Sequence, residues 1–268
     1  MNRFRLIFLS LCMMAVSSSS FAMNDVVEAR LAMPIITSML DNPKTLYCNC
    51  PIDFKGDRFD FHLSSCTEYK VHNSSNILRA TRIEIEHVFT AYELGHDRRC
   101  WLKGQRQNCS QNDSFFAEAE GDLHNIFPSV GEVNLERSNY AFTDDLSGKS
   151  GFGGCEMLID RKKRLVEPPD YAKGAVARAM FYMSETYKIP LKHDQRKLFF
   201  KWDKSFPPDS NECFRDKLIF LMQGNHNHLI TEKCKALNID KKPTKAQKER
   251  INKFLKALPD LKKAYLEK

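Results

Sequence analysis

The sequence predicts an α+β fold for this chain. Stretches in which apolar residues recur at helical spacing outnumber the short alternating stretches typical of strands, and the two kinds do not alternate regularly. Between residues 22 and 235 lie about 210 residues, enough for one domain with a sizeable core. No internal repeat and no long low-complexity linker divides this region.

The first 22 residues have the layout of a secretory signal peptide. Arg3 and Arg5 precede an apolar run over residues 6–16, and small residues then lead to a cleavage site after Ala22. The run is too short for a comfortable transmembrane helix, although an uncleaved anchor is the alternative interpretation. We therefore expect a periplasmic or secreted mature chain that is monomeric and has no stable membrane association.

The mature chain is expected to open with a helix. Apolar residues follow helical spacing at Val27, Leu31, Ile35 and Met39, and Pro34 is a place for a kink. Further along, Pro168-Pro169 followed by Asp170 is typical of a helix start, with Asp170 as the N-cap. The other expected segments are short strands with disulfide-rich loops over residues 47–87, a long loop over 101–116, and helices over 129–139, 170–188, 191–201 and 213–222.

The last segment, residues 235–268, differs from the rest in charge. It carries a net charge of +7, whereas the body over residues 23–234 carries −2, so the basic pI does not describe the body. Thr244 and Gln247 form a capping box that predicts an amphipathic helix. We expect its apolar stripe to dock on the body and its lysines to contact phosphates, with a solubility extension as the alternative. The stripe consists of Ile251, Phe254, Leu255 and Leu258, and Pro259 is expected to interrupt the helix.

Eight cysteines follow the expected signal peptide. An even number in an oxidising compartment predicts four disulfides. A zinc site is the alternative, but no two cysteines have the C-x-x-C spacing. Spacing suggests only two local pairs, Cys100 with Cys109 and Cys213 with Cys234. The other disulfide candidates are Cys48, Cys50, Cys66 and Cys155.

Side chains capable of chemistry gather at the end of one predicted strand. In the stretch TRIEIEH, residues 81–87, polar and apolar residues alternate and end on Glu86 and His87. Neighbours on a strand point to opposite faces, so the pair alone also fits a solvated glutamate beside a packed histidine. About 30 residues later, residues 118–139 bring a second dense group of polar side chains around a short predicted helix.

Several blocks resemble, in collinear order, the periplasmic and secreted endonuclease I family of ββα-metal (His-Me finger) nucleases. Together they cover residues 24–234, and such ordered blocks are more specific than any single motif. Thr90 stands where the family often has proline. The resemblance implies a ββα-metal core surrounded by helices and disulfide-linked loops. The blocks are IEIEHVFTAYELGH, CW, GQRQNC, GDLHNIFPSVGEVNLERSNYAF, VEPPDYAKGAVARAMFYM, WDKSFPPD and QGNHN.

The same resemblance implies a role for each site residue. Glu86 and Asn134 match the two protein ligands of one divalent cation, His87 matches the general base, and Arg106 matches the arginine beside the scissile phosphate. A carboxylate and an amide oxygen are hard ligands, which suits Mg²⁺, with Ca²⁺ or Mn²⁺ as substitutes. Two further residues are expected to support the ligands or to bind the cation through water: they are Glu120 and His124.

The implied activity is a metal-dependent, sequence-nonspecific endonuclease that cleaves DNA, with RNA as a second candidate substrate, and leaves 5′-phosphate ends. Two other classes compete. One is an exported nucleic-acid-binding protein for DNA uptake or attachment without catalysis, and the other is a disulfide-linked effector acting on host surfaces. A base beside a metal ligand favours the enzyme. The resemblance implies that the segment GNHNH, residues 224–228, is a turn rather than a zinc site. Arg178 and the basic run over residues 161–164 are candidate phosphate contacts, with a basic turn in solvent as the alternative.

Overall fold

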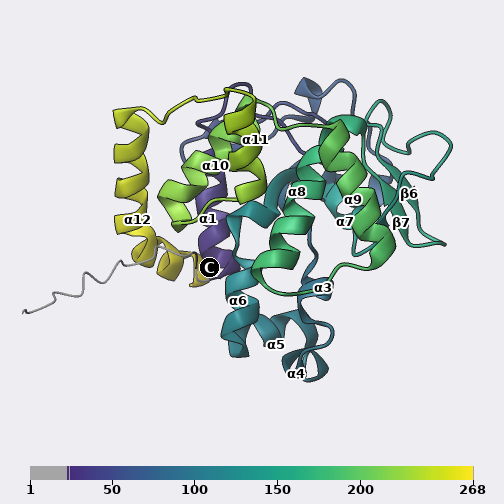
Figure 1. Cartoon of the computed structure of the whole chain (residues 1–268), viewed down its shortest axis with the longest axis horizontal. Helices are drawn as coiled ribbons and strands as arrows, with labels where there is room; N and C mark the ends of the chain where they lie inside the picture. The colour runs from purple at the N-terminus through teal and green to yellow at the C-terminus, as the bar shows by residue number, and fades with distance from the viewer. Residues whose placement is uncertain (1–22, 24, 268) are drawn as a thin grey trace, which may run out of the picture.

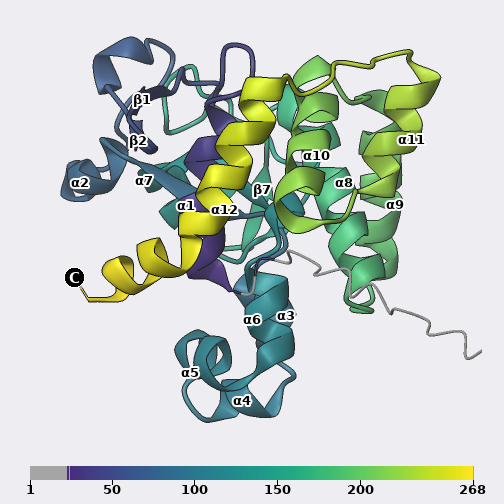
Figure 2. The ribbon, with the colours of Figure 1, turned by 90° about the vertical axis from the view of Figure 1, so that its left-hand side faces the viewer.

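The structure is a computed structural model that describes Met23 and residues 25–267, so the expected signal peptide lies outside the described residues. The described chain is mostly helical and carries three small separate sheets, which confirms the α+β class (Figure 1). Helices α4, α5 and α6 lie together below the rest of the molecule, and α12 runs across α1 (Figure 2). Within the described residues, we find no helix with the length and apolar character needed to cross a membrane.

The elements follow one another without a regular alternation of strand and helix. The strands are β1 (Asp53–Lys55), β2 (Arg58–Asp60), β3 (Ile83–His87), β4 (Ile126–Val130), β5 (Ala141–Phe142), β6 (Leu158–Asp160) and β7 (Leu165–Glu167). The α-helices are α1 (Val26–Thr37), α2 (Ile77–Ala80), α3 (Ala91–Gly95), α4 (Arg99–Leu102), α5 (Gln105–Asn112), α6 (Ser114–Glu120), α7 (Gly131–Arg137), α8 (Asp170–Thr186), α9 (His193–Ser205), α10 (Ser210–Gln223), α11 (His228–Ala236) and α12 (Lys245–Leu266).

The central unit consists of the antiparallel pair β3–β4 and the helix α7 that follows β4 directly. Glu86 lies opposite Phe127 and His87 lies opposite Ile126, while α3 to α6 form the insertion between the two strands. A Cβ atom at Gly131 would lie 2.9 Å from the Glu84 carboxylate, so the glycine lets the start of α7 close onto β3. This close approach brings polar residues of α7 onto the carboxylates of β3.

Two hydrophobic clusters flank the central pair. Ile85 and Ile126 pack with α1, α10 and α12, whereas Phe127, Val130 and Val133 pack with α8 and α9. β4 contributes to both clusters, whereas β3 contributes Ile85 to one of them. The pair is therefore held rigidly at the centre of the domain, and the end of β3 is a fixed platform.

Residues 101–116 form helices, so the expectation of a long loop was wrong. Local propensity favoured a loop because the passage is polar and contains a glycine with several Asn and Ser residues. Three contacts that propensity does not register stabilise the helices instead. The Cys100–Cys109 disulfide joins α4 to α5, the Asp113 carboxylate accepts from the first turn of α6 at Phe116, and Arg98 pairs with Asp113 at 2.8 Å.

Three element boundaries also differ from expectation. The helix expected over residues 129–139 begins only at Gly131, because residues 126–130 pair with β3 as a strand. Asp170 is the first residue of α8, and Pro169 occupies the N-cap. Helix α12 continues through Pro259 instead of ending there, and its ribbon bends on the way to the C-terminus (Figure 2).

The C-terminal helix α12 belongs to the same packed unit as the body. Ile251, Phe254 and Leu258 are buried against α1 and α10, and Leu255 is partly buried, which confirms the expected docking stripe. The expected capping box of Thr244 and Gln247 is also present. The expected segment boundary after residue 234 falls inside α11, which extends to Ala236.

The eight described cysteines form four disulfides, as expected. The local pairs Cys100–Cys109 and Cys213–Cys234 are confirmed. Of the other two bonds, which spacing did not suggest, one joins the loop region before β3 to the segment between β5 and β6, and the second lies within that loop region. They are Cys48–Cys155 and Cys50–Cys66.

Candidate active site

His87 is the last residue of β3, and one ring nitrogen is already committed. Its Nε2 lies 2.9 Å from the backbone carbonyl of Glu120. A carbonyl only accepts, so Nε2 carries the proton and Nδ1 keeps its lone pair. Burial, and then the nearby Arg106 guanidinium, lower the pKa of His87 to about 3. The imidazole is therefore neutral at ordinary pH and can accept a proton at Nδ1.

Glu86, on the opposite face of the strand from His87, is a buried carboxylate with two cationic or polar neighbours. The Tyr47 hydroxyl donates to Oε1 at 2.9 Å. Arg137 Nε lies 3.3 Å from the same oxygen, a charge contact whose N–H is not aimed for a hydrogen bond. Burial raises the pKa of Glu86 to about 7, against the opposing effects of Arg137 and Tyr47. Both described contacts fall on Oε1, which leaves Oε2 for the neighbouring cavity.

Asn134 projects from α7 with its amide held in one orientation by Glu84. Its Nδ2 donates to Glu84 Oε2 at 3.0 Å, and a carboxylate cannot accept from the amide oxygen, so Oδ1 faces away from Glu84. Burial alone would raise the pKa of Glu84, but hydrogen bonds from Arg79 and Arg82 hold this pKa below its ordinary value. Glu84 is thus ionised and acts as a fixed acceptor.

Arg106 reaches the site from α5 through Glu120. Its Nε forms an ion pair with Glu120 Oε1, while Ser110 donates to Glu120 Oε2 at 2.6 Å. Glu120 is fully buried, whereas the Arg106 side chain is 48% exposed. One residue therefore supports two others, because the Glu120 carboxylate holds Arg106 and its backbone carbonyl holds His87.

The candidate residues line a continuous hollow at the end of β3. A cavity of about 320 Å³ has Glu86, His87, Arg106 and Asn134 in its wall. A neighbouring cavity of about 580 Å³ shares Arg79, Arg106 and Asn134 with it and adds two more arginines. These arginines come from different segments of the chain, and such a basic wall suits a polyanionic ligand. They are Arg30 and Arg82.

Residues 37–234 match the family described as Endonuclease I. The chain belongs to the endonuclease I family. An extracellular deoxyribonuclease of Aeromonas hydrophila is 44% identical over 195 residues, which cover 72% of this chain and 84% of the relative. An Endonuclease-1 of Buchnera aphidicola subsp. Baizongia pistaciae is 44% identical over 206 residues, covering 75% of this chain and 82% of that protein. A periplasmic deoxyribonuclease of Aeromonas hydrophila is 43% identical over 194 residues, covering 72% and 80%.

Membership makes this chain a nuclease, of a family that is metal-dependent in general. Among the described residues, no cluster of three or more His, Cys, Asp or Glu side chains is arranged to hold a metal ion. The pair Glu86 and Asn134 is not such a cluster, since it offers one carboxylate and one amide oxygen. A buried carboxylate and an oriented amide oxygen on one cavity nevertheless fit a hard cation that keeps several of its waters.

Of the two expected support residues, the structure brings only Glu120 to the site. His124 lies in a short 3₁₀ turn after α6, not one helical turn beyond Glu120 as expected. Its Nε2 lies 3.2 Å from the carbonyl of Asn225, and its ring packs on Tyr182 at 4.7 Å. His124 therefore faces α8 and the loop after α10, where it is a packing residue.

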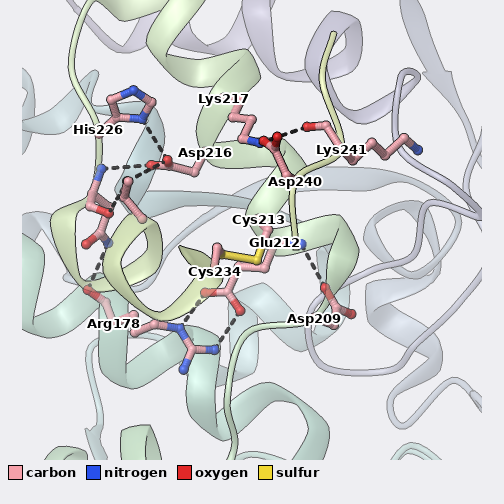
Figure 3. The surroundings of a disulfide bond; sticks show 12 residues. Arg178, Asp209, Glu212, Cys213, Asp216, Lys217, His226, Cys234, Asp240 and Lys241 are labelled. Carbon is pink, nitrogen blue, oxygen red and sulfur yellow. Dashed lines mark hydrogen bonds and ion pairs between the residues drawn. A yellow bond between two sulfur atoms is a disulfide. The ribbon is translucent and has the colours of Figure 1, made fainter. Parts of the chain in front are cut away.

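The segment around GNHNH is a turn, as expected. Gly224 ends α10 in a left-handed conformation with φ of 92°. His226 Nδ1 lies 2.7 Å from Asp216 Oδ2 beside the Cys213–Cys234 disulfide (Figure 3). In the same region Arg178 is buried in ion pairs with Glu212 and Asp203, so it is not available for a phosphate and that expectation was wrong.

Three residues that contact the candidate site residues were not assigned from the sequence, namely Tyr47, Glu84 and Arg137. Two of them had a local signal. Glu84 precedes Glu86 by two residues and so shares its strand face, while Arg137 follows Asn134 by three residues and so shares its helix face. Tyr47 lies 39 residues before Glu86, and no local pattern connects them.

Proposed function

We propose that this member of the endonuclease I family is a periplasmic or secreted, Mg²⁺-dependent and sequence-nonspecific DNA endonuclease. One observation carries the proposal. A neutral imidazole with a free Nδ1 lines the same cavity as a buried carboxylate, an oriented amide oxygen and an arginine. The relatives named as extracellular and periplasmic deoxyribonucleases support both the substrate and the location.

Each residue has a distinct role in phosphodiester hydrolysis. His87 Nδ1 takes a proton from the attacking water, and the Glu120 carbonyl fixes the tautomer that makes this possible. Arg106 binds a non-bridging oxygen of the phosphate with the part of its guanidinium that Glu120 leaves free. Glu86 and Asn134 hold the cation, which supplies positive charge to the phosphate and the leaving oxygen. We infer 5′-phosphate products from this arrangement of base and cation.

The proposal is tested with end-labelled duplex DNA and an RNA of the same sequence, incubated with the oxidised mature protein. We expect Mg²⁺-dependent internal cleavage of DNA at many sites, 5′-phosphate termini, and complete loss of cleavage in EDTA. Binding of DNA without cleavage in Mg²⁺, Mn²⁺ or Ca²⁺ would instead support a binding protein for uptake or attachment. Comparison of the two substrates gives the DNA-to-RNA preference directly.

The Mg²⁺ requirement should depend on pH through Glu86. Its pKa of about 7 means that the metal-free carboxyl gains a proton as pH falls through neutrality. Proton and cation then compete, so the Mg²⁺ concentration for half-maximal cleavage should rise as pH falls, by up to about tenfold per pH unit. His87 stays neutral over this range because its pKa is about 3. Titrations of Mg²⁺ at several pH values on both sides of neutrality measure the effect. An acid limb that excess Mg²⁺ does not relieve would contradict it.

We also propose that the exposed lysines of α12 make sequence-independent phosphate contacts. Truncation is a poor test because the apolar stripe of α12 belongs to the core, so charge removal is preferable. Replacing Lys248, Lys253 and Lys256 by glutamine should flatten the logarithmic salt dependence of DNA binding by about 0.9 for each phosphate that is no longer neutralised. A matched triple change on and beside α9 should leave that slope unchanged. An unaltered slope in the α12 variant would leave solubility as the role of the tail. The control changes are Lys192→Gln, Lys197→Gln and Lys204→Gln.

A further inference from the structure

Tyr47 is a fully buried residue whose hydroxyl touches the proposed metal ligand. The hydroxyl donates to Glu86 Oε1 at 2.9 Å, and this is the one hydrogen bond of good geometry that the described residues make to this carboxylate. Arg137 contributes charge at 3.3 Å from the same oxygen but no aligned N–H. The direction in which Glu86 presents Oε2 to the cavity therefore depends on the Tyr47 phenol.

The backbone around Tyr47 is fixed on both sides. The amide N–H of Leu46 donates to the carbonyl of Pro128 in β4 at 2.9 Å, which ties the segment to the central strand pair. The Tyr47 carbonyl accepts from the Tyr171 hydroxyl at 2.6 Å, which ties it to the start of α8. Because the phenol stands on an anchored backbone, its hydroxyl cannot drift from the carboxylate without breaking one of these bonds.

Two disulfides enclose the same segment. Cys48 follows Tyr47 directly and is bonded to Cys155, 107 residues away in the sequence. Cys50, two residues after Cys48, is bonded to Cys66. The segment has no regular secondary structure beyond an isolated bridge, so these covalent bonds replace the ladder of hydrogen bonds that fixes a strand residue. The disulfides therefore act on the site through the position of Tyr47.

We propose that Tyr47 is a positioning residue that orients Glu86 for the cation, held in place by the Tyr171 contact and the Cys48–Cys155 bond. The inference rests on the proposed function, in which Glu86 is a metal ligand. Outer partners of metal ligands typically set affinity by a factor of about 10 to 100. Tyr47 should accordingly govern how tightly Mg²⁺ or Mn²⁺ binds, and it should leave the rate of the fully loaded enzyme largely intact.

The test is calorimetric titration of Mg²⁺ and Mn²⁺ into the oxidised mature protein, with no DNA present. Tyr47→Phe should weaken binding about 10- to 100-fold. In cleavage assays the same change should raise the Mg²⁺ concentration for half-maximal rate, while the rate at saturating Mg²⁺ stays close to that of the unaltered protein. Tyr171→Phe, at a half-exposed position that tolerates the change, should weaken binding in the same direction but less. If Tyr47→Phe does not fold, the metal affinity of Tyr171→Phe tests the inference in its place.

A matched control is available within the same loop region. Tyr69 is also buried and its hydroxyl donates to the buried Glu132 at 2.5 Å, so Tyr69→Phe should lower the melting temperature without changing metal affinity. Tyr47→Phe, or in its place Tyr171→Phe, that binds the cation as tightly as the unaltered protein would overturn the inference. Glu86→Gln separates the two proposals: if it too leaves affinity unchanged, the metal assignment itself has failed.

Discussion

Replacing His87 by alanine is expected to lower DNA cleavage by a factor of about 10² to 10⁴, the usual contribution of a general base. The imidazole is the neutral group of this cavity with a free lone pair, since Nε2 is committed to the Glu120 carbonyl at 2.9 Å. Neither Glu86 nor Asn134 has a described contact with the His87 ring. Metal affinity and DNA affinity should therefore change little, and the loss should appear in the rate at saturating Mg²⁺.

The measurement pairs cleavage rates in Mg²⁺ with DNA binding by fluorescence anisotropy in Ca²⁺. His62→Ala is a suitable control, because His62 is exposed and contacts Asp60 on the surface at 3.4 Å. Full cleavage activity in purified His87→Ala protein, with contamination excluded by the parallel control preparation, would reject the assignment of the base. A loss of DNA affinity as large as the loss of cleavage rate would show that His87 acts in substrate binding and not as the general base.

Reduction of the disulfides is expected to inactivate and unfold the protein. A disulfide typically stabilises a protein by about 2–4 kcal/mol, and the whole free energy of unfolding of a domain is about 5–15 kcal/mol. Four bonds together therefore match the total stability. A precursor in a reducing cytosol would for the same reason remain inactive, which protects the DNA of the cell that makes it.

Melting temperature and cleavage should be followed against the fraction of free thiols as reductant is increased. We expect activity to disappear before or together with the folded signal. Cys213→Ser with Cys234→Ser removes only the bond between α10 and α11 and should retain cleavage below its melting temperature. Fully reduced protein that keeps its melting temperature and its activity would show that the disulfides do not hold the site together.

The residues proposed to carry the chemistry were assigned through the family resemblance, because they lie in ordered sequence blocks that mark local positions in the fold. Glu86 and His87 end an alternating strand, and Asn134 lies in the helix that follows the partner strand. The supporting contacts were not recognisable, because Tyr47 meets Glu86 only through the tertiary fold. His124 was misplaced for a related reason, since its role depends on a turn conformation that spacing alone does not determine.

The fold was predictable where apolar spacing is strong and failed where tertiary constraints override propensity. Helix α12 shows the former, because Phe254 and its neighbours fall on one buried stripe. Residues 101–116 show the latter, because the disulfide and the Asp113 cap stabilise helices in a polar passage. Pro259 does not end α12, since apolar packing holds the helix before the proline and Lys262 pairs with Asp25 and Glu28 after it.

Every role proposed for the site depends on Glu86 and Asn134 binding one cation beside His87. Anomalous difference density from crystals grown with Mn²⁺, a substitute for Mg²⁺ in sites of oxygen ligands, locates that cation without reference to activity. We predict a single strong peak bound by the Glu86 carboxylate and the Asn134 amide oxygen in the cavity that His87 lines. A peak elsewhere, for example at His226 and Asp216, with none between Glu86 and Asn134, would contradict this assignment.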